Sequence, residues 1–583
     1  MSGQPKRPAG ATGTGLAGGL THYGDPAFSL YLRRSFAKSM GYSEAMLGRP
    51  VVGIAYTPSG FNNCHRHFPE LLEAVKRGVL AGGALPLEFP TISLGEAYLT
   101  PTSLKFRNLM AMDTEEMIRA QPMDAVVLMG GCDKTVPAQL MGALSADKPA
   151  VQLVAGPMMT GSYGGERLGA CTDCRRFWAR FRAGQIDETE IGRIEDNLAT
   201  TTGTCAVMGT ASTMACIAEA LGMALPGSAA IPAVHADRLR CAEATGLVAA
   251  GLAGSDRRPS RIVTAASVEN ALRVLLAIGG STNAVIHLAA IAGRAGLPLS
   301  LERLNQLSDG TPVLVNLKPV GSHYMEDFHA AGGLDGVLRA LAPLLHLDCP
   351  TVTGETLGER LARPPARPVD HRIVRPAEDP IEPVGGLVAL FGSLAPGGAI
   401  LKRSAADPAL FERTARAVVF KDLADLAARI DDPALDVTAE DALVLQNAGP
   451  TSPAAMPEAG YLPIPRKLAA AGVKDMIRIS DARMSGTAFG TVILHVTPEA
   501  AAGGPLALVE TGDRIRLSVA GRRLDLLVDA AELERRRQRW TAEAAQRPPA
   551  ERGYASLYQA HVLQADAGCD FDFLTARGRT QGL

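Results

Sequence analysis

Short apolar runs alternate with helix-length amphipathic segments along the first third of this chain. Four runs have the length and apolar content of buried strands: 51–55, 85–89, 125–129 and 150–154. Helical periodicity fits the segments between them: 68–81, which ends at a glycine pair, 114–120 and 137–144. This alternation predicts an α/β fold with a doubly wound parallel sheet.

The pattern changes twice further along the chain. Residues 155–365 are mostly helical in character with glycine-rich interruptions, and the proline-rich segment 363–368 is the best linker candidate. Short strands then dominate, at 387–391, 417–420, 442–445, 476–479, 491–496 and 514–519, before a charged helix at 533–547. We therefore predict an N-terminal α/β domain over 1–365 and a β-rich, barrel-like C-terminal domain over 366–583.

Composition narrows the class of protein. The chain has 583 residues, of which 47% are hydrophobic and 20% charged, and its net charge of −2 argues against a nucleic-acid or membrane-surface binder. Residues 1–20 lack the apolar core of a signal peptide, and the most apolar tract, 271–297, is too interrupted by polar residues to span a bilayer. Nine cysteines over this length are no disulfide framework, so we expect free thiols and a cytoplasmic location.

Unusual side chains follow three successive strands of the predicted sheet. Cys64 lies in the loop after the first strand, Glu96 in the loop after the second, and Cys132, Asp133 and Lys134 directly after the third. Ligands of open α/β sheets bind outside the carboxyl ends of the strands. The sequence therefore predicts a set of potential metal ligands at one edge of the sheet.

The cysteines allow two kinds of metal or redox site. Cys64, Cys132 and Cys205 lie in polar or glycine-flanked loops without zinc-finger spacing, and an iron–sulfur cluster can recruit thiolates from distant loops. The rival is the CxxC at Cys171 and Cys174, which suits zinc or dithiol chemistry. No second CxxC or HxxxH lies at a usable distance, and both possibilities stay open at this level.

Carboxylates and one serine complete the candidate chemistry. Glu96, Asp133 and Glu458 suit a hard cation such as Mg²⁺. Lys134 as an ammonium would repel that cation, whereas carbamylation would turn its amine into an anionic oxygen ligand. Ser485, followed by a glycine, exposes its hydroxyl in a loop, but no neighbouring histidine points to a Ser-His-Asp hydrolase.

Six ordered motifs make the chain resemble the dihydroxy-acid and 6-phosphogluconate dehydratase family over nearly its whole length. They are GGCDKT (130–135), GTC (203–205), GSTNA (280–284), MED (325–327), MPE (456–458) and SDARMSGT (480–487). The segments ISLGE (92–96), GERLGACTDCRR (165–176) and GYLPIP (460–465) are similar to its sugar-acid branch, typified by L-arabinonate dehydratase. This resemblance implies that the CxxC at Cys171 and Cys174 is a sequence signature of the sugar-acid branch.

The resemblance implies a cofactor and a role for each candidate residue. It implies a [2Fe–2S] cluster on Cys64, Cys132 and Cys205, with one iron lacking a fourth protein ligand. It implies Mg²⁺ on Glu96, Asp133, carbamylated Lys134 and Glu458. Ser485 would act as the base in its alkoxide form, with Thr487 as a second catalytic candidate.

The expected reaction is dehydration of C5 or C6 aldonates, such as L-arabinonate, to 2-keto-3-deoxy acids. The base removes the C2 proton and the C3 hydroxyl leaves. The alternatives are a dihydroxy-acid dehydratase of branched-chain amino-acid synthesis, or a promiscuous member that acts on both substrates. A zinc or thiol-redox protein built on the CxxC is the rival from another class. We expect a small-molecule substrate, no nucleic-acid or membrane partner, and a homodimer or homotetramer.

Overall fold

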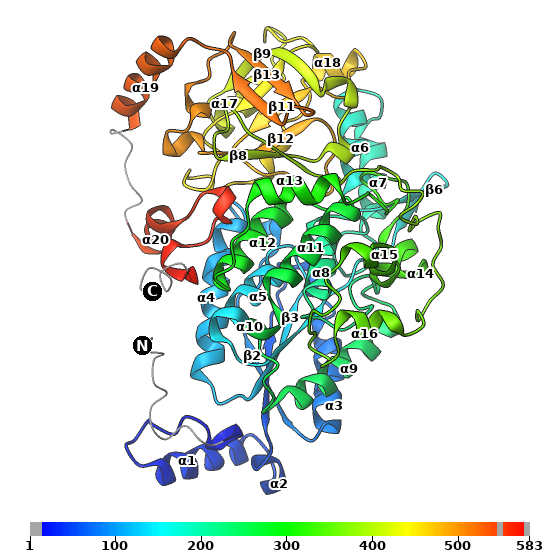
Figure 1. Cartoon of the computed structure of the whole chain (residues 1–583), viewed down its shortest axis with the longest axis vertical. Helices are drawn as coiled ribbons and strands as arrows, with labels where there is room; N and C mark the ends of the chain where they lie inside the picture. The colour runs from blue at the N-terminus through cyan, green and yellow to red at the C-terminus, as the bar shows by residue number, and fades with distance from the viewer. Residues whose placement is uncertain (1–13, 545–551, 577–583) are drawn as a thin grey trace.

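Four parallel strands form the central sheet of the N-terminal half (Figure 1). The computed structural model describes residues 14–544 and 552–576. The strands are β1 (Val51–Tyr56), β2 (Leu85–Pro90), β3 (Ala125–Gly130) and β4 (Ala150–Val154), in the order β2-β1-β3-β4. The four predicted strands are confirmed, each to within one residue.

Helices cover both faces of this sheet. Helix α3 (Phe68–Ala81) packs against α9 (Ala236–Leu252), and α4 (Leu104–Ala120) packs against α5 (Thr135–Ala146). The chain moves from β1 to β2 in one direction across the sheet and from β2 through β3 to β4 in the other. Right-handed crossovers therefore put α3 on one face and α4 with α5 on the other. The doubly wound fold is therefore confirmed. Helix α4 starts ten residues before the predicted segment, since buried polar residues such as Arg107 and Asn108 hide its apolar periodicity.

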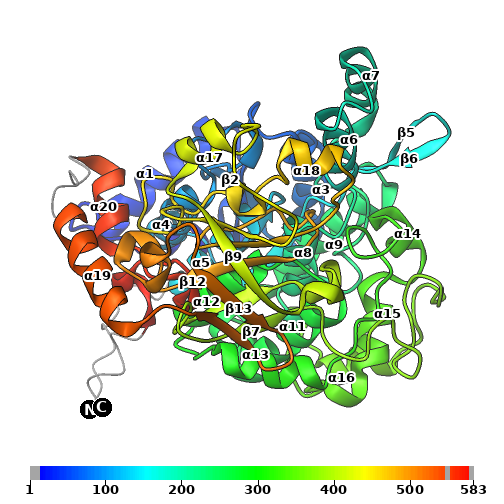
Figure 2. The same cartoon turned by 90° about the horizontal axis from the view of Figure 1, so that it is seen from above.

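The middle of the chain is helical, as predicted. Its helices are α6 (Thr172–Arg182), α7 (Glu188–Leu198), α8 (Thr210–Ala220), α10 (Pro259–Ile262), α11 (Ala265–Ala277), α12 (Asn283–Arg294), α13 (Leu301–Asp309), α14 (Met325–Ala330), α15 (Gly333–Leu341) and α16 (Leu357–Ala362). Helices α8 and α12 are buried on nearly all sides and extend the core of the sheet. A hairpin of β5 (Gly161–Tyr163) and β6 (Glu166–Leu168) projects with α7 from the body of the molecule (Figure 2).

The C-terminal half contains a nearly closed eight-stranded sheet, which confirms the predicted barrel-like part. Its strands are β7 (Val388–Leu390), β8 (Gly398–Leu401), β9 (Glu412–Phe420), β10 (Ala442–Leu445), β11 (Ile477–Ser480), β12 (Val492–Thr497), β13 (Arg514–Ser518) and β14 (Arg523–Leu526), in the order β14-β13-β9-β10-β11-β12-β8-β7. The two edges meet where the Phe391 N–H donates to the Arg522 carbonyl at 2.9 Å and the Leu524 N–H donates to the Phe391 carbonyl at 2.8 Å. Closure removes the exposed edges of the sheet.

Strands β9 to β12 run parallel, so their carboxyl ends share one end of the barrel. Successive residues of β9 face opposite sides: Ala417 and Val419 join the core inside the sheet, while Val418 and Phe420 join a second core outside it. Helices α17 (Leu423–Arg429) and α18 (Arg466–Ala470) belong to the outer layer. The strands β10 and β11 are therefore packed on both faces, and this fixes the starting points of the loops that lead to the site described below.

The remaining helices lie toward the chain ends. They are α1 (Pro26–Ser39), α2 (Glu44–Leu47), α19 (Ala530–Ala544) and α20 (Gly553–His561). Helix α19 matches the predicted charged helix, of which residues 545–547 lie outside the described residues, as does the segment 1–13. None of the described helices combines the length and the apolar character that a bilayer crossing requires. The predicted domain boundary at 365/366 stays a prediction.

A buried lysine next to β8 predicts how the stability of the protein depends on pH. Lys402 is fully buried and its Nζ has no hydrogen-bond partner among the described residues. Burial lowers the pKa of Lys402 to about 7. Between pH 7 and pH 10 the unfolded chain therefore binds one more proton than the folded chain, and stability should rise with pH in that window.

We expect Lys402→Met to raise the free energy of unfolding at pH 7 by about 4 kcal/mol, an order-of-magnitude figure for this proton linkage. The gain in melting temperature should shrink as pH approaches 10. Lys421→Met, at an exposed position next to β9, is the matched control. An equal gain at pH 7 and pH 10 would show that proton linkage at Lys402 is not the cause.

Candidate active site

One cavity of about 1230 Å³ collects residues from both halves of the chain. Its wall includes all three cysteines expected to bind a cluster, Cys64, Cys132 and Cys205. It also includes Glu96, Asp133 and Glu458 and the two hydroxyl residues Ser485 and Thr487. Lys134 lies beside it, fully buried. Candidates separated by more than 400 positions thus meet in one place.

The N-terminal candidates leave the sheet at its carboxyl edge. Cys64 lies in a short 3-10 turn after β1, Glu96 begins another after β2, and Cys132 follows β3 directly. The loop at Gly131 is tight: a Cβ there would lie 2.3 Å from the Cβ of Ala155, so only glycine fits. The predicted gathering at one sheet edge is the arrangement found.

A buried histidine holds the cysteine loop in place. His65 Nε2 accepts hydrogen bonds from the N–H groups of Gly131 and Cys132, each at 3.0 Å, and its Nδ1 donates to the Thr57 carbonyl at 2.7 Å. Burial lowers the pKa of His65 to about 3. The ring therefore stays neutral at physiological pH, which keeps Nε2 an acceptor for the loop.

Each cysteine that is expected to bind the cluster contacts another thiol. Contact with the Cys64 thiol, together with burial, raises the pKa of the Cys132 thiol. Cys205 Sγ lies 3.5 Å from Cys171 Sγ. Contact with Cys171 and burial raise the pKa of the Cys205 thiol as well. The cavity thus has one thiol pair beside the N-terminal sheet and another between residues 171 and 205.

Three carboxylates converge beside these thiols. Oxygen atoms of Glu96, Asp133 and Glu458 all lie within 4.8 Å of one another. Glu96 comes from the first half and Glu458 from the 3-10 turn after β10. Lys134 pairs with Asp133 and lies 3.8 Å from Glu96. Such a set of oxygen donors is suited to a hard divalent cation.

Arg483 joins the two halves and was not assigned a role from the sequence. It is fully buried and donates to Glu458 at 2.7 Å, to Glu96 at 2.8 Å and to the Met456 carbonyl at 2.9 Å. Only its place in the SDARMSGT motif could have marked it. A buried guanidinium shared by two carboxylates fixes their spacing across the interface between the halves.

The carboxylates respond to these charges in opposite directions. Burial acts to raise the pKa of Glu96, but the Arg483 guanidinium and the Lys134 ammonium outweigh it and hold that pKa well below its usual value. Burial raises the pKa of Glu458, Arg483 opposes this, and the Glu96 charge adds to the rise. Neighbouring carboxylates with divergent pKa values are a mark of functional sites.

Ser485 and Thr487 reach the cavity from the loop after β11. Their hydroxyl oxygens lie 2.8 Å apart, and the Thr487 N–H lies 3.4 Å from Ser485 Oγ. Gly486 between them is required by packing, because a Cβ there would lie 2.6 Å from the Thr210 nitrogen. The loop therefore presents two adjacent hydroxyl groups on a fixed backbone.

The CxxC does not form a metal site of its own. Cys174 Sγ donates to the Cys171 carbonyl at 2.6 Å, and the thiols of Cys171 and Cys174 also contact each other. Among the described residues, no group of three potential ligands within 4.8 Å includes either cysteine. The segment instead starts α6, whose buried Asp173 accepts from Lys318 at 2.9 Å and from Tyr324 at 3.0 Å.

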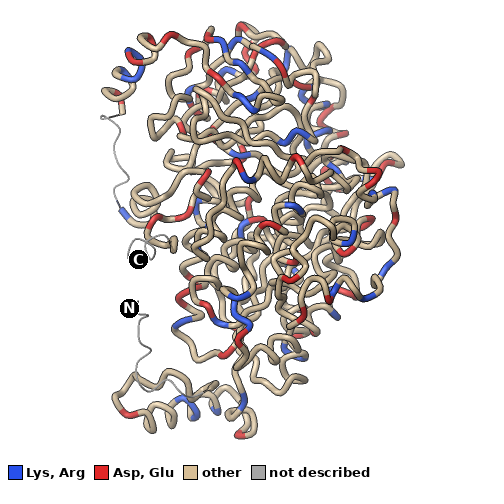
Figure 3. Tube along the Cα trace, in the orientation of Figure 1, with Lys and Arg blue, Asp and Glu red and all other residues tan. Residues whose placement is uncertain are grey.

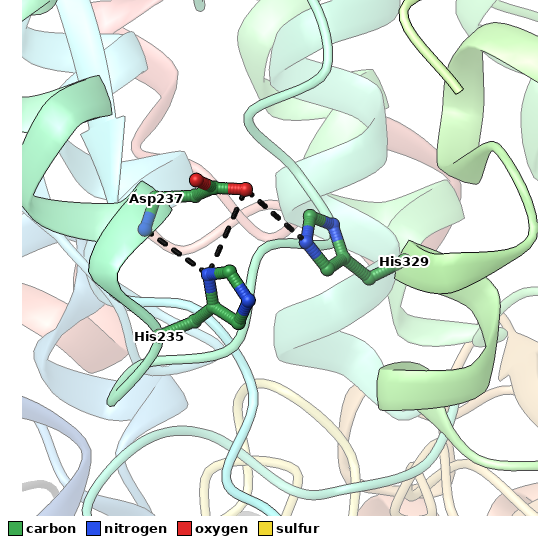
Figure 4. Close-up of side chains that lie close together, drawn as sticks. All are labelled: His235, Asp237 and His329. Carbon is green, nitrogen blue, oxygen red and sulfur yellow. Dashed lines mark hydrogen bonds and ion pairs between the residues drawn. The ribbon is translucent and has the colours of Figure 1, made fainter.

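A second cluster of potential ligands lies away from this cavity (Figure 4). His235 and His329 point toward Asp237, with nitrogen–oxygen distances of 3.6 Å and 3.8 Å. Asp237 is already paired with Arg240 and Arg367, and His235 Nδ1 accepts the Asp237 N–H. Two guanidinium groups on the one carboxylate oppose a cation there.

The chain is similar to known proteins of one family over most of its length. The family model described as dihydroxy-acid/6-phosphogluconate dehydratase N-terminal matches residues 49–360, and the corresponding C-terminal model matches 372–569. The 6-deoxy-6-sulfo-D-gluconate dehydratase of Pseudomonas putida is 47% identical over 91% of this chain and 92% of its own length. The L-arabinonate dehydratase of Rhizobium leguminosarum bv. trifolii is 46% identical over 96% of both chains.

A dihydroxy-acid dehydratase, from Syntrophobacter fumaroxidans, is 38% identical over 92% of this chain and 96% of its own. The two sugar-acid dehydratases are thus more similar to this chain than that enzyme is. The resemblance found in the motifs is confirmed: the chain belongs to the dihydroxy-acid/6-phosphogluconate dehydratase family, on its sugar-acid branch, and is a hydro-lyase.

Proposed function

We propose that this enzyme dehydrates aldonates to 2-keto-3-deoxy acids with an iron–sulfur cluster and Mg²⁺ as cofactors. One observation carries the proposal: a single cavity holds three far-separated thiols, three converging carboxylates and Ser485. The alternatives are the branched-chain dihydroxy acid as substrate, or activity on both. The higher identity to sugar-acid dehydratases favours the aldonates.

The thiol geometry suits a dinuclear cluster better than a single zinc ion. Four ligands of one tetrahedral ion all lie about 3–4 Å from one another. Here no three cysteine sulfurs of the described residues lie within 4.8 Å of one another, although two contacting pairs face the same cavity. Cys64, Cys132 and Cys205 would hold the cluster. When bound, the cluster would supply an iron Lewis acid for the departing C3 hydroxyl.

The carboxylate set suits Mg²⁺. Glu96, Asp133 and Glu458 would hold the ion, together with Lys134 in carbamylated form. As an ammonium, Lys134 places a buried positive charge next to the site, whereas a carbamate adds an oxygen donor. When bound, Mg²⁺ would neutralise the substrate carboxylate and the charge that develops on the enolate.

Ser485 is the base in this proposal. Ser485 lines the cavity, and an alkoxide at its Oγ would be stabilised by the Thr487 hydroxyl at 2.8 Å and the Thr487 N–H at 3.4 Å. The alkoxide takes the proton from C2 of the sugar acid. The bond between C3 and its hydroxyl then breaks, and the enol product tautomerises to the 2-keto-3-deoxy acid. Arg483 keeps Glu96 and Glu458 at a fixed spacing throughout.

The cavity wall also bears on substrate choice. Basic and acidic residues are interspersed along the described trace (Figure 3), whereas α6 and the loop after α18 bring basic residues to the cavity: Arg175, Arg176, Arg180, Arg182 and Lys474. Arg176 and Arg182 are paired with acidic residues. Arg175 has no ion-pair partner among the described residues, its Nε is unpartnered, and it stacks on Tyr461. It is free to bind a hydroxyl-rich or anionic substrate tail.

Arg175→Gln is expected to raise KM for an aldonate about 10- to 100-fold, because a charge-assisted hydrogen bond contributes about 1.5–3 kcal/mol. The change in kcat should be smaller, since Arg175 is assigned to substrate binding and not to proton transfer. Steady-state kinetics would measure both constants. Arg193→Gln, an exposed substitution on α7, is the control. An unchanged KM would remove Arg175 from the binding site.

The substrate assignment is tested by a direct comparison. The anaerobically purified enzyme is assayed with a panel of C5 and C6 aldonates and with 2,3-dihydroxyisovalerate, and keto-acid formation is followed. We expect kcat/KM to be at least tenfold higher for one or more aldonates. A preference for the branched-chain substrate would contradict the assignment, and similar values would identify a promiscuous enzyme.

We also propose a homodimer or homotetramer that works in the cytoplasm. Helix α1 and the residues next to it expose large apolar side chains, Tyr23, Phe28, Tyr31, Phe36 and Met40, and Figure 1 shows this helix at the edge of the molecule. Apolar side chains gathered in this way are typical of association surfaces. All nine thiols are free, which suits a reducing compartment.

A further inference from the structure

Cys171 has no part in the chemistry described so far, although it touches a proposed cluster ligand. Its Sγ lies 3.5 Å from Cys205 Sγ, within reach of a hydrogen bond between sulfur atoms. Both residues line the cavity. This distance is far longer than a disulfide bond of about 2.05 Å. The contact is therefore one between two separate thiols.

The backbone sets this contact. The Ala206 N–H donates to the Ala170 carbonyl at 2.9 Å, which places the two cysteine segments side by side. On the far side of Cys205, Thr204 N–H donates to the Gly156 carbonyl at 2.9 Å. Cys174 Sγ donates to the Cys171 carbonyl at 2.6 Å and braces the turn. The sulfur–sulfur approach is thus held by neighbouring hydrogen bonds on both segments.

Cys171 occupies the N-cap position of α6, an eleven-residue helix, yet its side chain makes no capping hydrogen bond. Serine, threonine, aspartate and asparagine are the usual residues at this position. Its thiol is directed at Cys205 instead of the free N–H groups of the helix. Thr172, the next residue, donates to the Thr487 carbonyl at 3.0 Å. The turn therefore touches both the cysteine and the serine loop of the site.

We propose that Cys171 is a positioning residue that donates an S–H hydrogen bond to the cluster-bound thiolate of Cys205. This rests on the proposed function. Without a metal, either sulfur can donate; a thiol that coordinates iron has lost its proton, which leaves Cys171 as the donor. A hydrogen bond to a ligating sulfur withdraws electron density from the iron, raises the reduction potential and strengthens the iron as a Lewis acid.

The test uses the anaerobically purified full chain with its cluster, and compares wild type with Cys171→Ala and Cys171→Ser. We expect Cys171→Ala to shift the reduction potential of the cluster downward and its iron–thiolate Raman bands to higher frequency. Cys171→Ser keeps a hydroxyl donor and should restore most of both values. Cys241→Ala, outside the cavity, should match wild type.

A second measurement compares hydrogen–deuterium exchange in the wild type and in Cys171→Ala. Exchange of the wild-type enzyme into D₂O should shift an iron–thiolate Raman band, because the donor is an exchangeable S–H, and this shift should vanish in Cys171→Ala. A Cys171→Ala enzyme that contains the cluster and keeps the wild-type reduction potential, Raman bands and D₂O shift would overturn this inference. The proposed function would not be affected by that result. Direct coordination of iron by Cys171, or a disulfide between Cys171 and Cys205, would also overturn the inference. Absence of iron and sulfide from wild type would instead refute the proposed function.

Discussion

Alanine in place of Ser485 is expected to lower kcat by at least about 10³-fold, the range that a positioned base contributes. The C2–H of a sugar acid is weakly acidic, so its removal depends on a base at a fixed place. Ser485 lines the cavity, and its hydroxyl oxygen lies 2.8 Å from that of Thr487. Visible absorption and melting temperature should stay at wild-type values, because among the described residues the Ser485 side chain is hydrogen-bonded to Thr487 and not to a thiol. Steady-state kinetics and absorption spectra would measure these quantities.

Two variants sharpen this experiment. Ser162→Ala removes an exposed hydroxyl on β5, outside the cavity, and should be indistinguishable from wild type. Thr487→Val should lose activity to a lesser degree, about 10- to 100-fold, because it removes a hydrogen bond to the base and not the base itself. A Ser485→Ala enzyme with kcat within tenfold of wild type would mean that another group takes the proton.

Replacing Cys132 with serine should strip the enzyme of the proposed iron–sulfur cluster. Cys132 is nearly fully buried, contacts Cys64, and is held by His65 through its own N–H. A hydroxyl is a much poorer iron ligand than a thiolate, and the fixed loop prevents another side chain from replacing it. We expect iron, acid-labile sulfide and visible absorption to fall by more than about tenfold, and activity with them.

Cys241→Ser is the matched control, since that half-buried cysteine lies on α9 outside the cavity. It should retain wild-type iron and sulfide. Circular dichroism would separate loss of the cluster from loss of the fold in Cys132→Ser. A folded variant with full iron, sulfide and activity would contradict the assignment of Cys132 as a ligand.

Much of this site could be predicted from the sequence, because its residues directly follow strands that the sequence pattern predicts. The run 125–129 followed by a glycine pair predicted both β3 and the loop that carries Cys132 and Asp133. Parallel strands then brought Cys64 and Glu96 to the same edge. The motif at 480–487 placed Ser485 after a strand, and the structure has β11 there.

The side-chain contacts between the two halves of the chain could not be predicted from the sequence. Arg483 contacts Glu96, which lies 387 positions away in the sequence. The local sequence around either residue does not predict that they are in contact. His65 reads as an ordinary loop histidine until β1 and β3 are side by side. Strands β8 and β14 were not predicted, and each has its place in the barrel through tertiary pairing: β8 pairs with β12 and β7, and β14 pairs with β13 and contacts Phe391. Such contacts depend on tertiary packing, which periodicity does not record.

The most direct test of the central claim is the metal and sulfide content of the chain after purification without oxygen. With a two-iron cluster in the cavity, the protein should be brown and hold about two irons and two acid-labile sulfides per chain. A colourless protein that contains zinc, or no iron, and yet dehydrates an aldonate at full rate would contradict the account.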